Sequence, residues 1–312
     1  RQKRQRRARR TLAARGLVEA VTWSFVPRAL AQAFGGGQAE LELANPISAD
    51  LTTMRPSLLP GLLTALERNR NRGFADVALF ELGQAYAGSG EADQLANVAG
   101  VRSGTAGTCG SGRHWQGAAH TVTVFDAKSD ALAVLAALGI DPAKTQVTRD
   151  APAWFHPGRS GAVRLGPKTV LAVFGEIHPG TLKAIDVTGP VVGFEIFLDA
   201  LPAEKRKSRV RPPLDASDLL PVRRDFAFIL NRDVAAADVM KAAAAADKTL
   251  VQGVSVFDVF DGGALASEGK KSLAIEVTLH PRTETLTDKD IEQVCEKIIA
   301  GVKKATGGEI RG

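Results

Sequence analysis

Cysteine, methionine and tyrosine are scarce in this 312-residue sequence, which contains two, two and one of them. The two thiols, Cys109 and Cys295, are too few for a disulfide framework, so we predict a cytoplasmic protein from a reducing compartment. No apolar run approaches the roughly 20 residues that cross a bilayer, and no signal peptide precedes the first helical segment, so we expect no membrane partner. The chain begins with Arg1 rather than Met, and we therefore expect it to be part of a longer protein.

Metal-ligand and phosphate-loop motifs are also missing. None of the five histidines lies four residues from a second histidine or a cysteine, and Cys109 and His114 have no matching second pair, so we predict no metal site. The stretch 110–113 resembles a phosphate-binding loop in composition only, because no Lys-Ser/Thr pair opens a helix after it. The order of residues leaves a Ser-His-Asp or Cys-His site open, although no nucleophile elbow is present.

Charge is distributed unevenly along the chain. The net charge is +6, yet residues 1–15 carry eight basic side chains and no acidic one, while residues 215–312 have a net charge of −3. The terminal cluster suits contact with nucleic-acid phosphates. A solvated helix face explains it equally well, so both interpretations stay open.

Hydrophobic periodicity predicts mixed helices and antiparallel strands over residues 1–200, which is an α+β arrangement. A helix rich in Arg and Ala is expected before Gly16. The other expected helices are residues 62–72 and 127–138, and the expected strands are residues 18–26, 41–43, 77–82, 160–165, 170–177 and 191–197.

Residues 201–217 form a basic linker with several prolines, because few of their side chains could join a core. We therefore place one domain at residues 1–200 and a second at residues 218–311. The second domain is predicted to follow the order β-α-β-β-α-β of the ferredoxin-like fold. Its expected strands are residues 224–230, 254–260, 272–279 and 309–311, and its expected helices are residues 235–246 and 287–304.

Alternation in the third strand of this second domain predicts a sheet with one uncovered face. Four apolar residues are expected to point toward the helices, and the four that alternate with them to point away. The first set is Leu273, Ile275, Val277 and Leu279, and the second is Ala274, Glu276, Thr278 and His280. RNA-recognition modules of this topology leave one sheet face open in the same way.

Longer strings of residues carry a closer resemblance. The ordered strings RDFAFIL, VFDVFDGG, GKKSLAIEVTL, RTETLTDKDIE and GGEIRG resemble the ferredoxin-fold anticodon-binding (FDX-ACB) domain that closes the β subunit of bacterial phenylalanyl-tRNA synthetase. The upstream part is similar to the catalytic-like module of that subunit, a class II synthetase fold built around an antiparallel sheet. The strings that carry this second resemblance are RRTLAARGLVEAVTWSF, LANPISADLTTMRPSLLPGLLTALERNRNR, FELGQAY, WFHPGRSG, FGEIHPGTL and FEIFLDAL.

The resemblance implies a role in the ATP-dependent charging of tRNA(Phe), within an α2β2 heterotetramer that contains the α subunit. It also implies that ATP and Mg act on the α subunit and on missing upstream domains, and that this fragment itself binds no cofactor. Two other functions stay open: a weak adenylating activity of residues 1–200, and a free-standing RNA-binding or regulatory paralogue of the β subunit.

A class II active site needs arginines on the ATP phosphates, because adenylate formation builds negative charge at phosphorus. FELGQAY stands where the second motif would be and has no Arg, and GFEIFLDAL lacks the glycines and the Arg of the third motif. Arg55 and Arg159 remain, but we predict that no residue here is catalytic and that the sheet serves as a scaffold and dimer interface. Glu176 and Glu195 lie on apolar strands, where either a site or a structural hydrogen bond explains a buried acid.

The predicted tRNA contacts lie on the open sheet face and at strand ends. Phe260 is expected to stack on a base and to share its face with Val256 and Asp258, and Phe226 or Phe228 are further candidates for stacking. The candidate phosphate contacts are Arg223, Arg224, Lys270, Lys271, Arg282 and Arg311.

Two segments are predicted to lie at the interface with the α subunit. Residues 62–72 present an apolar stripe of Leu62, Leu63 and Leu66, and residues 1–23 end at the large anchor Trp23, close to Phe25. Ordinary core packing is the alternative for both segments.

Overall fold

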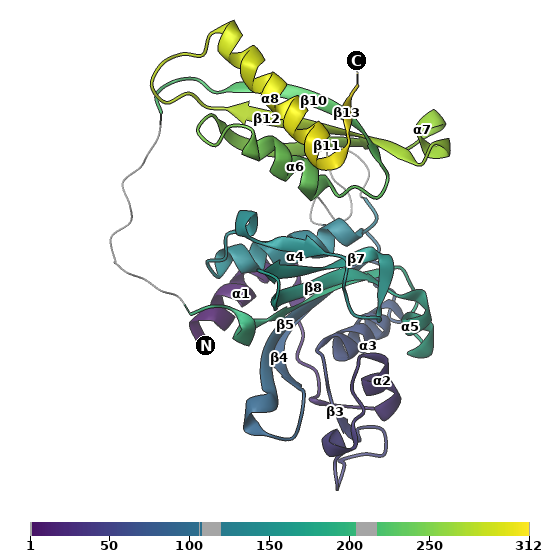
Figure 1. Ribbon diagram of the computed structural model, residues 1–312. Coiled ribbons are helices and arrows are strands. Elements are labelled where there is room, and N and C mark those ends of the chain that lie inside the picture. The colour runs from purple at the N-terminus through teal and green to yellow at the C-terminus, as the bar shows by residue number, and fades with distance from the viewer. Residues whose placement is uncertain (1, 106, 108–119, 204–216, 312) are drawn as a thin grey trace. The chain divides into compact units, whose positions relative to one another are not determined.

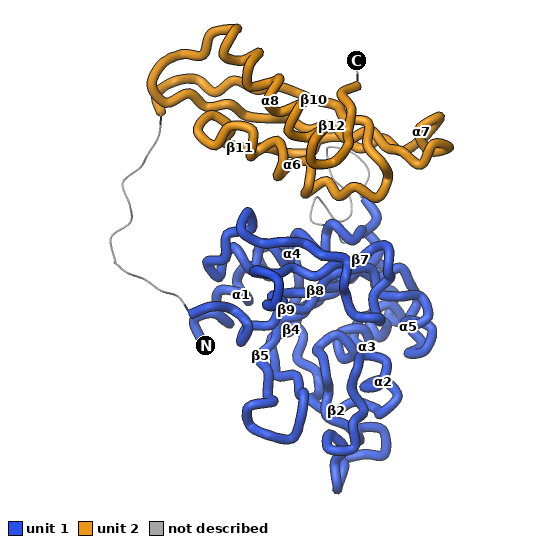
Figure 2. The backbone as a smooth tube through the Cα atoms, in the orientation of Figure 1, with its two compact units in different colours: residues 1–206 blue, residues 207–312 orange. Residues whose placement is uncertain are grey.

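The computed structural model describes residues 2–105, 107, 120–203 and 217–311, which fall into two compact units (Figure 2). Unit 1 comprises residues 1–206 and unit 2 comprises residues 207–312. Cys109, His114 and the stretch 110–113 lie outside the described residues, as do residues 204–216 of the predicted linker. None of the described helices has the length and hydrophobicity of a membrane span.

Unit 1 is built around a seven-stranded sheet in the order β1-β4-β5-β9-β8-β7-β6, and β2 and β3 form a separate two-stranded sheet. In the large sheet every neighbouring pair is antiparallel except β1 and β4. The strands are β1 (Val18–Glu19), β2 (Phe25–Val26), β3 (Thr53–Met54), β4 (Val77–Tyr86), β5 (Gln94–Ser103), β6 (Gln146–Thr148), β7 (Phe155–Leu165), β8 (Thr169–Ile177) and β9 (Val191–Phe197).

Helices cover both faces of this sheet, with α1 and α4 on one side and α3 and α5 on the other (Figure 1). Alternate residues of the central strands therefore enter two separate cores: Val98 packs on the α4 side and Ala99 on the α3 side. The helices are α1 (Gln2–Ala14), α2 (Arg28–Ala33), α3 (Leu59–Arg70), α4 (Val124–Ala137) and α5 (Pro179–Ala184), with short 3-10 turns at Ala39–Leu41, Glu91–Asp93, Pro142–Lys144 and Leu198–Ala200.

One row of residues across five strands explains why glycines occur in the middle of this sheet. Phe80, Gly100, Phe194, Phe174 and Gly161 are consecutive cross-strand partners. A Cβ atom at Gly100 would lie 2.6 Å from the ring of Phe194, and one at Gly161 would lie 3.0 Å from the ring of Phe174. The phenylalanine rings therefore fill the space that the two glycines leave.

We expect Gly100→Ala to destabilise unit 1 by roughly 1–3 kcal/mol, because the added methyl group overlaps a ring that is itself fixed in the core. Gly253→Ala is the control, since the nearest atom to its added Cβ is 4.0 Å away. Chemical denaturation followed by fluorescence measures both variants. Equal stability of Gly100→Ala and the parent chain would contradict the packing described.

Two strands predicted in the first 45 residues are wrong. Residues 18–26 form β1 and β2 instead of one strand, because Thr22 between them uses its backbone N–H and its hydroxyl to bind the Glu81 carboxylate. Residues 41–43 follow a 3-10 turn, and only an isolated bridge from Glu42 to Thr53 has β character there.

Unit 2 has the order β-α-β-β-α-β that the sequence predicts, with one additional short helix, and its sheet order is β11-β12-β10-β13. Helices α6 and α8 pack on one face of the sheet (Figure 1). This is the ferredoxin-like topology. The elements are β10 (Val222–Asn231), α6 (Ala236–Ala245), β11 (Val251–Phe260), α7 (Gly263–Ser267), β12 (Lys270–Leu279), α8 (Asp288–Thr306) and β13 (Glu309–Ile310).

The long helix α8 begins and ends at sequence signals. Thr287 and Asp290 form a capping box, in which the Thr287 hydroxyl accepts a hydrogen bond from the Asp290 N–H and the carboxylate accepts one from the Thr287 N–H. The hydrogen bonds that the Asp290 carboxylate accepts from the Thr287 hydroxyl and from the Thr287 N–H lower the pKa of Asp290. The helix ends at Gly307, which has a φ of 69°.

Candidate nucleic-acid interface

The two faces of the unit 2 sheet differ in burial as the alternation predicts. Leu273, Ile275, Val277 and Leu279 are at most 1% exposed and form the core with α6 and α8. The four residues that alternate with them are only half-buried by the part of the chain that the structure describes: Ala274, Glu276, Thr278 and His280. The face opposite the helices is therefore the one available to a ligand.

The seven predicted RNA contacts do not form one cluster. Phe260, Lys270 and Lys271 lie where β11 ends and β12 begins, whereas Arg223 and Arg224 lie at the start of β10, which pairs with the end of β12. Along the register of β10, the two lysines lie six to eight residues from the two arginines, which corresponds to about 20–27 Å. Arg282 follows β12 and belongs to the second group, and Arg311 follows β13 opposite the middle of β10.

In the first group, the two lysines have different surroundings. The Lys270 ammonium lies 2.9 Å from Glu268 at the exposed turn, and this hydrogen bond raises the pKa of Lys270. The Lys271 ammonium is half-buried and donates to the backbone carbonyls of Arg232 and Val234, at 3.1 and 2.5 Å. Lys271 therefore holds the connection between β10 and α6, while Lys270 remains at the surface.

In the second group, neighbouring arginines lie on opposite faces. Arg223 is in register with Thr278 on the open face and lies 3.7 Å from Glu276. Arg224 is in register with the buried Val277 and so lies on the helix side. Burial raises the pKa of the Cys295 thiol on α8, and the charge of Arg224 opposes that shift. Arg282 and Arg311 are exposed.

The aromatic candidates differ in exposure, and a bulge in β11 decides which residues share a face with Phe260. Phe226 and Phe228 are both buried, with their rings stacked 6.2 Å apart in the core, so neither is available to a base. Phe260 is 49% exposed and in register with Ser272, on the open face with Asp258. The expectation that Val256 shares this face is wrong, because the register shifts between Val256 and Asp258 and turns Val256 toward the helices.

The same bulge exposes a residue that sequence reasoning missed. Phe257, at the register shift, is 58% exposed, and Val259 is 53% exposed. Strand β11 lies at the edge of the sheet, where bulges are common. Val256 and Phe257 are adjacent apolar residues, so the alternation breaks at this point, and the expectation of uninterrupted alternation assigned Val256 to the wrong face.

In unit 1, a buried ion pair occupies the α3 side of the sheet. Arg55 is 3% exposed, and its guanidinium donates to the Glu81 carboxylate at 2.8 Å, to the Thr22 hydroxyl at 3.0 Å and to the Gln84 carbonyl at 2.8 Å. Glu81 belongs to the FELGQAY string and receives a second hydrogen bond from the Thr22 hydroxyl, at 2.7 Å. The hydrogen-bond donors of the Arg55 guanidinium are therefore directed at groups inside the fold.

Glu195 is enclosed nearby on the same side of the sheet. Its carboxyl group accepts hydrogen bonds from the Ser57 hydroxyl, the Leu58 N–H and the Asn97 side chain, at 2.6, 3.0 and 2.9 Å. Desolvation raises the pKa of Glu195, although these bonds and the Arg55 charge oppose the shift. Of the two explanations for this acid, the structure supports the hydrogen-bonded structural one.

The remaining charged candidates of unit 1 are paired at the surface. Arg159 donates two hydrogen bonds to Glu176, at 2.5 and 2.9 Å, and this contact raises the pKa of the guanidinium. Within the described residues, no three His, Cys, Asp or Glu side chains gather as metal ligands would.

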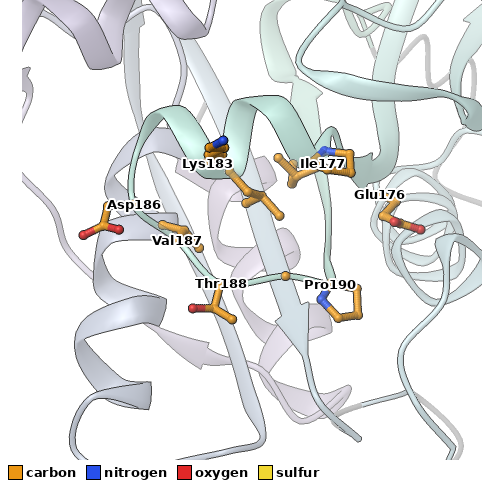
Figure 3. Close-up of a pocket in the computed structure, with 10 residues that line it drawn as sticks. Glu176, Ile177, Lys183, Asp186, Val187, Thr188 and Pro190 are labelled. Atoms are coloured by element: carbon orange, nitrogen blue, oxygen red, sulfur yellow. The ribbon is translucent and has the colours of Figure 1, made fainter.

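A hollow of about 450 Å³ lies between α5 and the segment that leads to Pro190 (Figure 3). The carboxylates of Glu176 and Asp186 point to opposite sides of it, and Ile177 and Val187 line it with apolar surface. A ligand site usually has a few polar groups that converge on one point, and this hollow has none that do so.

Comparison with known families matches both units. The family model described as "Phenylalanyl tRNA synthetase beta chain CLM domain" matches residues 1–198, and the model described as "Ferredoxin-fold anticodon binding domain" matches residues 217–311. The chain belongs to the phenylalanyl-tRNA synthetase beta chain family. The predicted fold class, a synthetase-like antiparallel module followed by a ferredoxin-like domain, is thereby confirmed.

Curated beta-chain relatives agree along the whole sequence. The phenylalanine–tRNA ligase beta subunit of Mesorhizobium japonicum is 52% identical over 312 residues, and that of Rhodopseudomonas palustris is 54% identical over 313 residues. Each alignment covers 100% of this chain and 39% of the relative, so the chain spans about two fifths of the length of these beta subunits. A solved pyrrolysyl-tRNA synthetase from Desulfitobacterium hafniense, 18% identical, covers 63% of this chain and 66% of its own with a TM-score of 0.46.

The buried acid of this beta chain predicts a specific pH dependence. Because the pKa of Glu195 is raised in the folded state, the folded chain holds the proton more tightly than the unfolded chain does. Its contribution to stability is present below the unfolded pKa of about 4.5 and is lost as the pH rises through the folded pKa. We therefore expect Glu195→Gln to gain stability relative to the parent chain as the pH rises from 4.5.

Denaturant unfolding at a series of pH values measures this difference. Glutamine keeps the acceptor for Leu58 and Asn97 and can donate to the Ser57 hydroxyl, so its packing is matched. Glu176→Gln, at a surface ion pair, is the control and should not show the same trend. A stability difference for Glu195→Gln that stays constant with pH would contradict the raised pKa.

Proposed function

We propose that this chain supports the ATP-dependent charging of tRNA(Phe), as part of a phenylalanine–tRNA ligase beta subunit that scaffolds the alpha subunit and binds tRNA near its anticodon. The observation that carries the proposal is the uncovered sheet face of the ferredoxin-fold unit, with the exposed ring of Phe260 on it. Anticodon bases are unpaired, and unpaired bases can stack on such a ring.

The RNA-binding site is placed at the β11–β12 end of the open face. Phe260 supplies a stacking surface, Phe257 lies three residues before it with its ring exposed, and Lys270 supplies a cation at the adjoining turn. Residues 215–312 have a net charge of −3, so general electrostatic attraction is weak and the few well-placed cations matter. Arg223, Arg282 and Arg311 would reach phosphates further along the strand.

Adenylation is assigned to the alpha subunit, together with ATP and Mg. Among the described residues of unit 1, the candidate Arg55 is not free to bind a nucleotide phosphate, because its guanidinium is used by Glu81, Thr22 and Gln84 inside the fold. Arg159 is paired with Glu176. We therefore assign no catalytic role to Arg55 or Arg159.

Contact with the alpha subunit is assigned to the segment after α1. Val21 and Trp23 are 90% and 64% exposed and border a hollow of about 280 Å³. Large exposed apolar side chains beside a hollow are typical of protein interfaces. The predicted stripe of α3 is not available for this, because Leu62, Leu63 and Leu66 are fully buried in the core of unit 1.

We expect Phe260→Ala in the intact ligase to weaken tRNA binding by about 1–3 kcal/mol, the usual contribution of one stacked base. Lys270→Ala should lower the salt slope of log K by about 0.7–0.9, the loss of one phosphate contact. Lys271→Ala is expected to act through stability instead, because its ammonium holds backbone carbonyls.

Filter binding at several salt concentrations measures both quantities. Phe125→Ala is the matched control, since this ring is 71% exposed on α4 of unit 1. If Phe260→Ala and Phe125→Ala bind tRNA equally well, with the affinity of the parent enzyme, the open face is not the RNA-binding site.

A further inference from the structure

Helix α1 has two distinct faces. Ala8 and Leu12 are fully buried and attach the helix to unit 1. The opposite face follows the spacing i, i+3, i+4, i+7, so its side chains form one stripe along the helix. The stripe consists of four exposed cations: Lys3, Arg6, Arg7 and Arg10.

The fold holds this stripe in place. Arg4 donates to the backbone carbonyls of Leu198 and Leu201, at 3.3 and 3.2 Å, which fixes the beginning of α1. Arg15, just after the helix, lies 2.6 Å from the buried carboxylate of Asp130 on α4. Each end of α1 therefore has its own polar attachment to unit 1, and the cations between them sit on a fixed support.

The stripe has no neutralising partner within the described residues. Arg9, next to it on the helix, pairs with Glu19 at 2.7 Å, but none of the four stripe cations forms an ion pair. Like charges at these spacings destabilise a helix by roughly 0.2–0.5 kcal/mol per pair. An external acidic surface would offset that repulsion.

The neighbourhood of the stripe indicates a protein partner. The Arg9–Glu19 pair holds β1 against α1, and exposed apolar residues follow in the chain: Val18 at 65%, Val21 at 90% and Trp23 at 64% exposure. Aliphatic side chains such as those of Val18 and Val21 give nothing to a phosphate backbone, whereas an apolar patch beside a charged stripe is typical of protein interfaces.

We propose that the stripe of α1 docks on an acidic surface of the partner subunit, which makes assembly of the ligase sensitive to salt. This inference rests on the proposed function, since it adds the charge of the partner's surface to the contact assigned to Val21 and Trp23. The stripe supplies electrostatic complementarity, and the apolar residues supply the buried contact.

The test uses the full-length beta subunit with its alpha subunit. In one variant Lys3, Arg6, Arg7 and Arg10 are replaced with Gln, which removes the charge and keeps a good helix former. The control variant replaces four exposed cations elsewhere in unit 1 with Gln: Arg72, Lys144, Lys168 and Lys183. Circular dichroism checks folding, and two half-stripe variants, Lys3/Arg6 and Arg7/Arg10, serve if the fourfold variant does not fold.

Analytical ultracentrifugation then measures assembly between about 0.05 and 0.5 M NaCl, a range over which exposed charges become screened. We expect the parent dissociation constant to rise at least about tenfold with salt. The stripe variant should assemble about tenfold more weakly at low salt and depend less on salt, while the control variant should match the parent.

Three outcomes of the stripe and control variants would overturn the inference. If the stripe variant assembles normally and binds tRNA more weakly, the stripe binds RNA. If neither its assembly nor its tRNA affinity changes, the stripe is a solvated helix face. If the control variant assembles as weakly as the stripe variant, the effect is a general one of net charge. A Trp23→Ala variant separates the two levels of the argument. If Trp23→Ala assembles more weakly while the stripe variant assembles normally, the interface at Trp23 stands and the acidic partner surface is rejected. If the parent beta subunit does not bind the alpha subunit, both the interface and the acidic partner surface are rejected.

Discussion

The α3 side of the sheet in unit 1 depends on the buried ion pair between Arg55 and Glu81. A guanidinium and a carboxylate removed from water must be hydrogen-bonded, and here Arg55 binds Glu81, the Thr22 hydroxyl and the Gln84 carbonyl. The pair joins the loop before α3 to strand β4, and the Ser57–Glu195 bond joins the same loop to strand β9. With these bonds formed, the α3 side of the sheet is closed by polar contacts as well as by the leucines of the helix.

This closure is consistent with the scaffold role that we propose for the sheet of unit 1. Glycine at position 83 leaves room for Arg55, since a Cβ there would lie 2.4 Å from the guanidinium. The strand that carries Glu81 is thus shaped around an internal partner rather than around a ligand. The exposed side chains that could bind a partner lie elsewhere. They are the apolar side chains after α1, the cations along α1, and the ring of Phe260 on the open sheet face of unit 2.

Sequence patterns predicted the parts of the fold in which a periodic run coincides with a buried face. The third strand of unit 2 alternates without interruption, and its four apolar residues are buried as expected. Helix α8 has both a capping box and a terminal glycine, so its bounds were predicted to within two residues. Strand β9 was predicted with its observed bounds because it is apolar except for Glu195 and begins directly after Pro190.

Other features depend on contacts that a sequence pattern does not contain. Thr22 interrupts a strand-like run because a carboxylate 59 residues away accepts its N–H and hydroxyl. The bulge near Phe257 changes which face Val256 occupies, and the adjacent apolar pair Val256-Phe257 does not by itself tell which of the two residues is inserted. Lys271 looks like any lysine in a hairpin, and only the fold shows that its ammonium is used by two carbonyls. Candidate sites were therefore harder to predict than the strands that carry them.

We propose that the buried charged groups Arg55, Glu81 and Glu195 of unit 1 are committed to the fold and that the beta chain does not form aminoacyl adenylate. ATP–pyrophosphate exchange with phenylalanine tests this most directly, because it detects adenylate formation without tRNA. The chain and the full-length beta subunit, each without alpha subunit, should show exchange at background level, while the intact ligase in the same assay is active. Exchange above background by the beta chain alone would contradict the account.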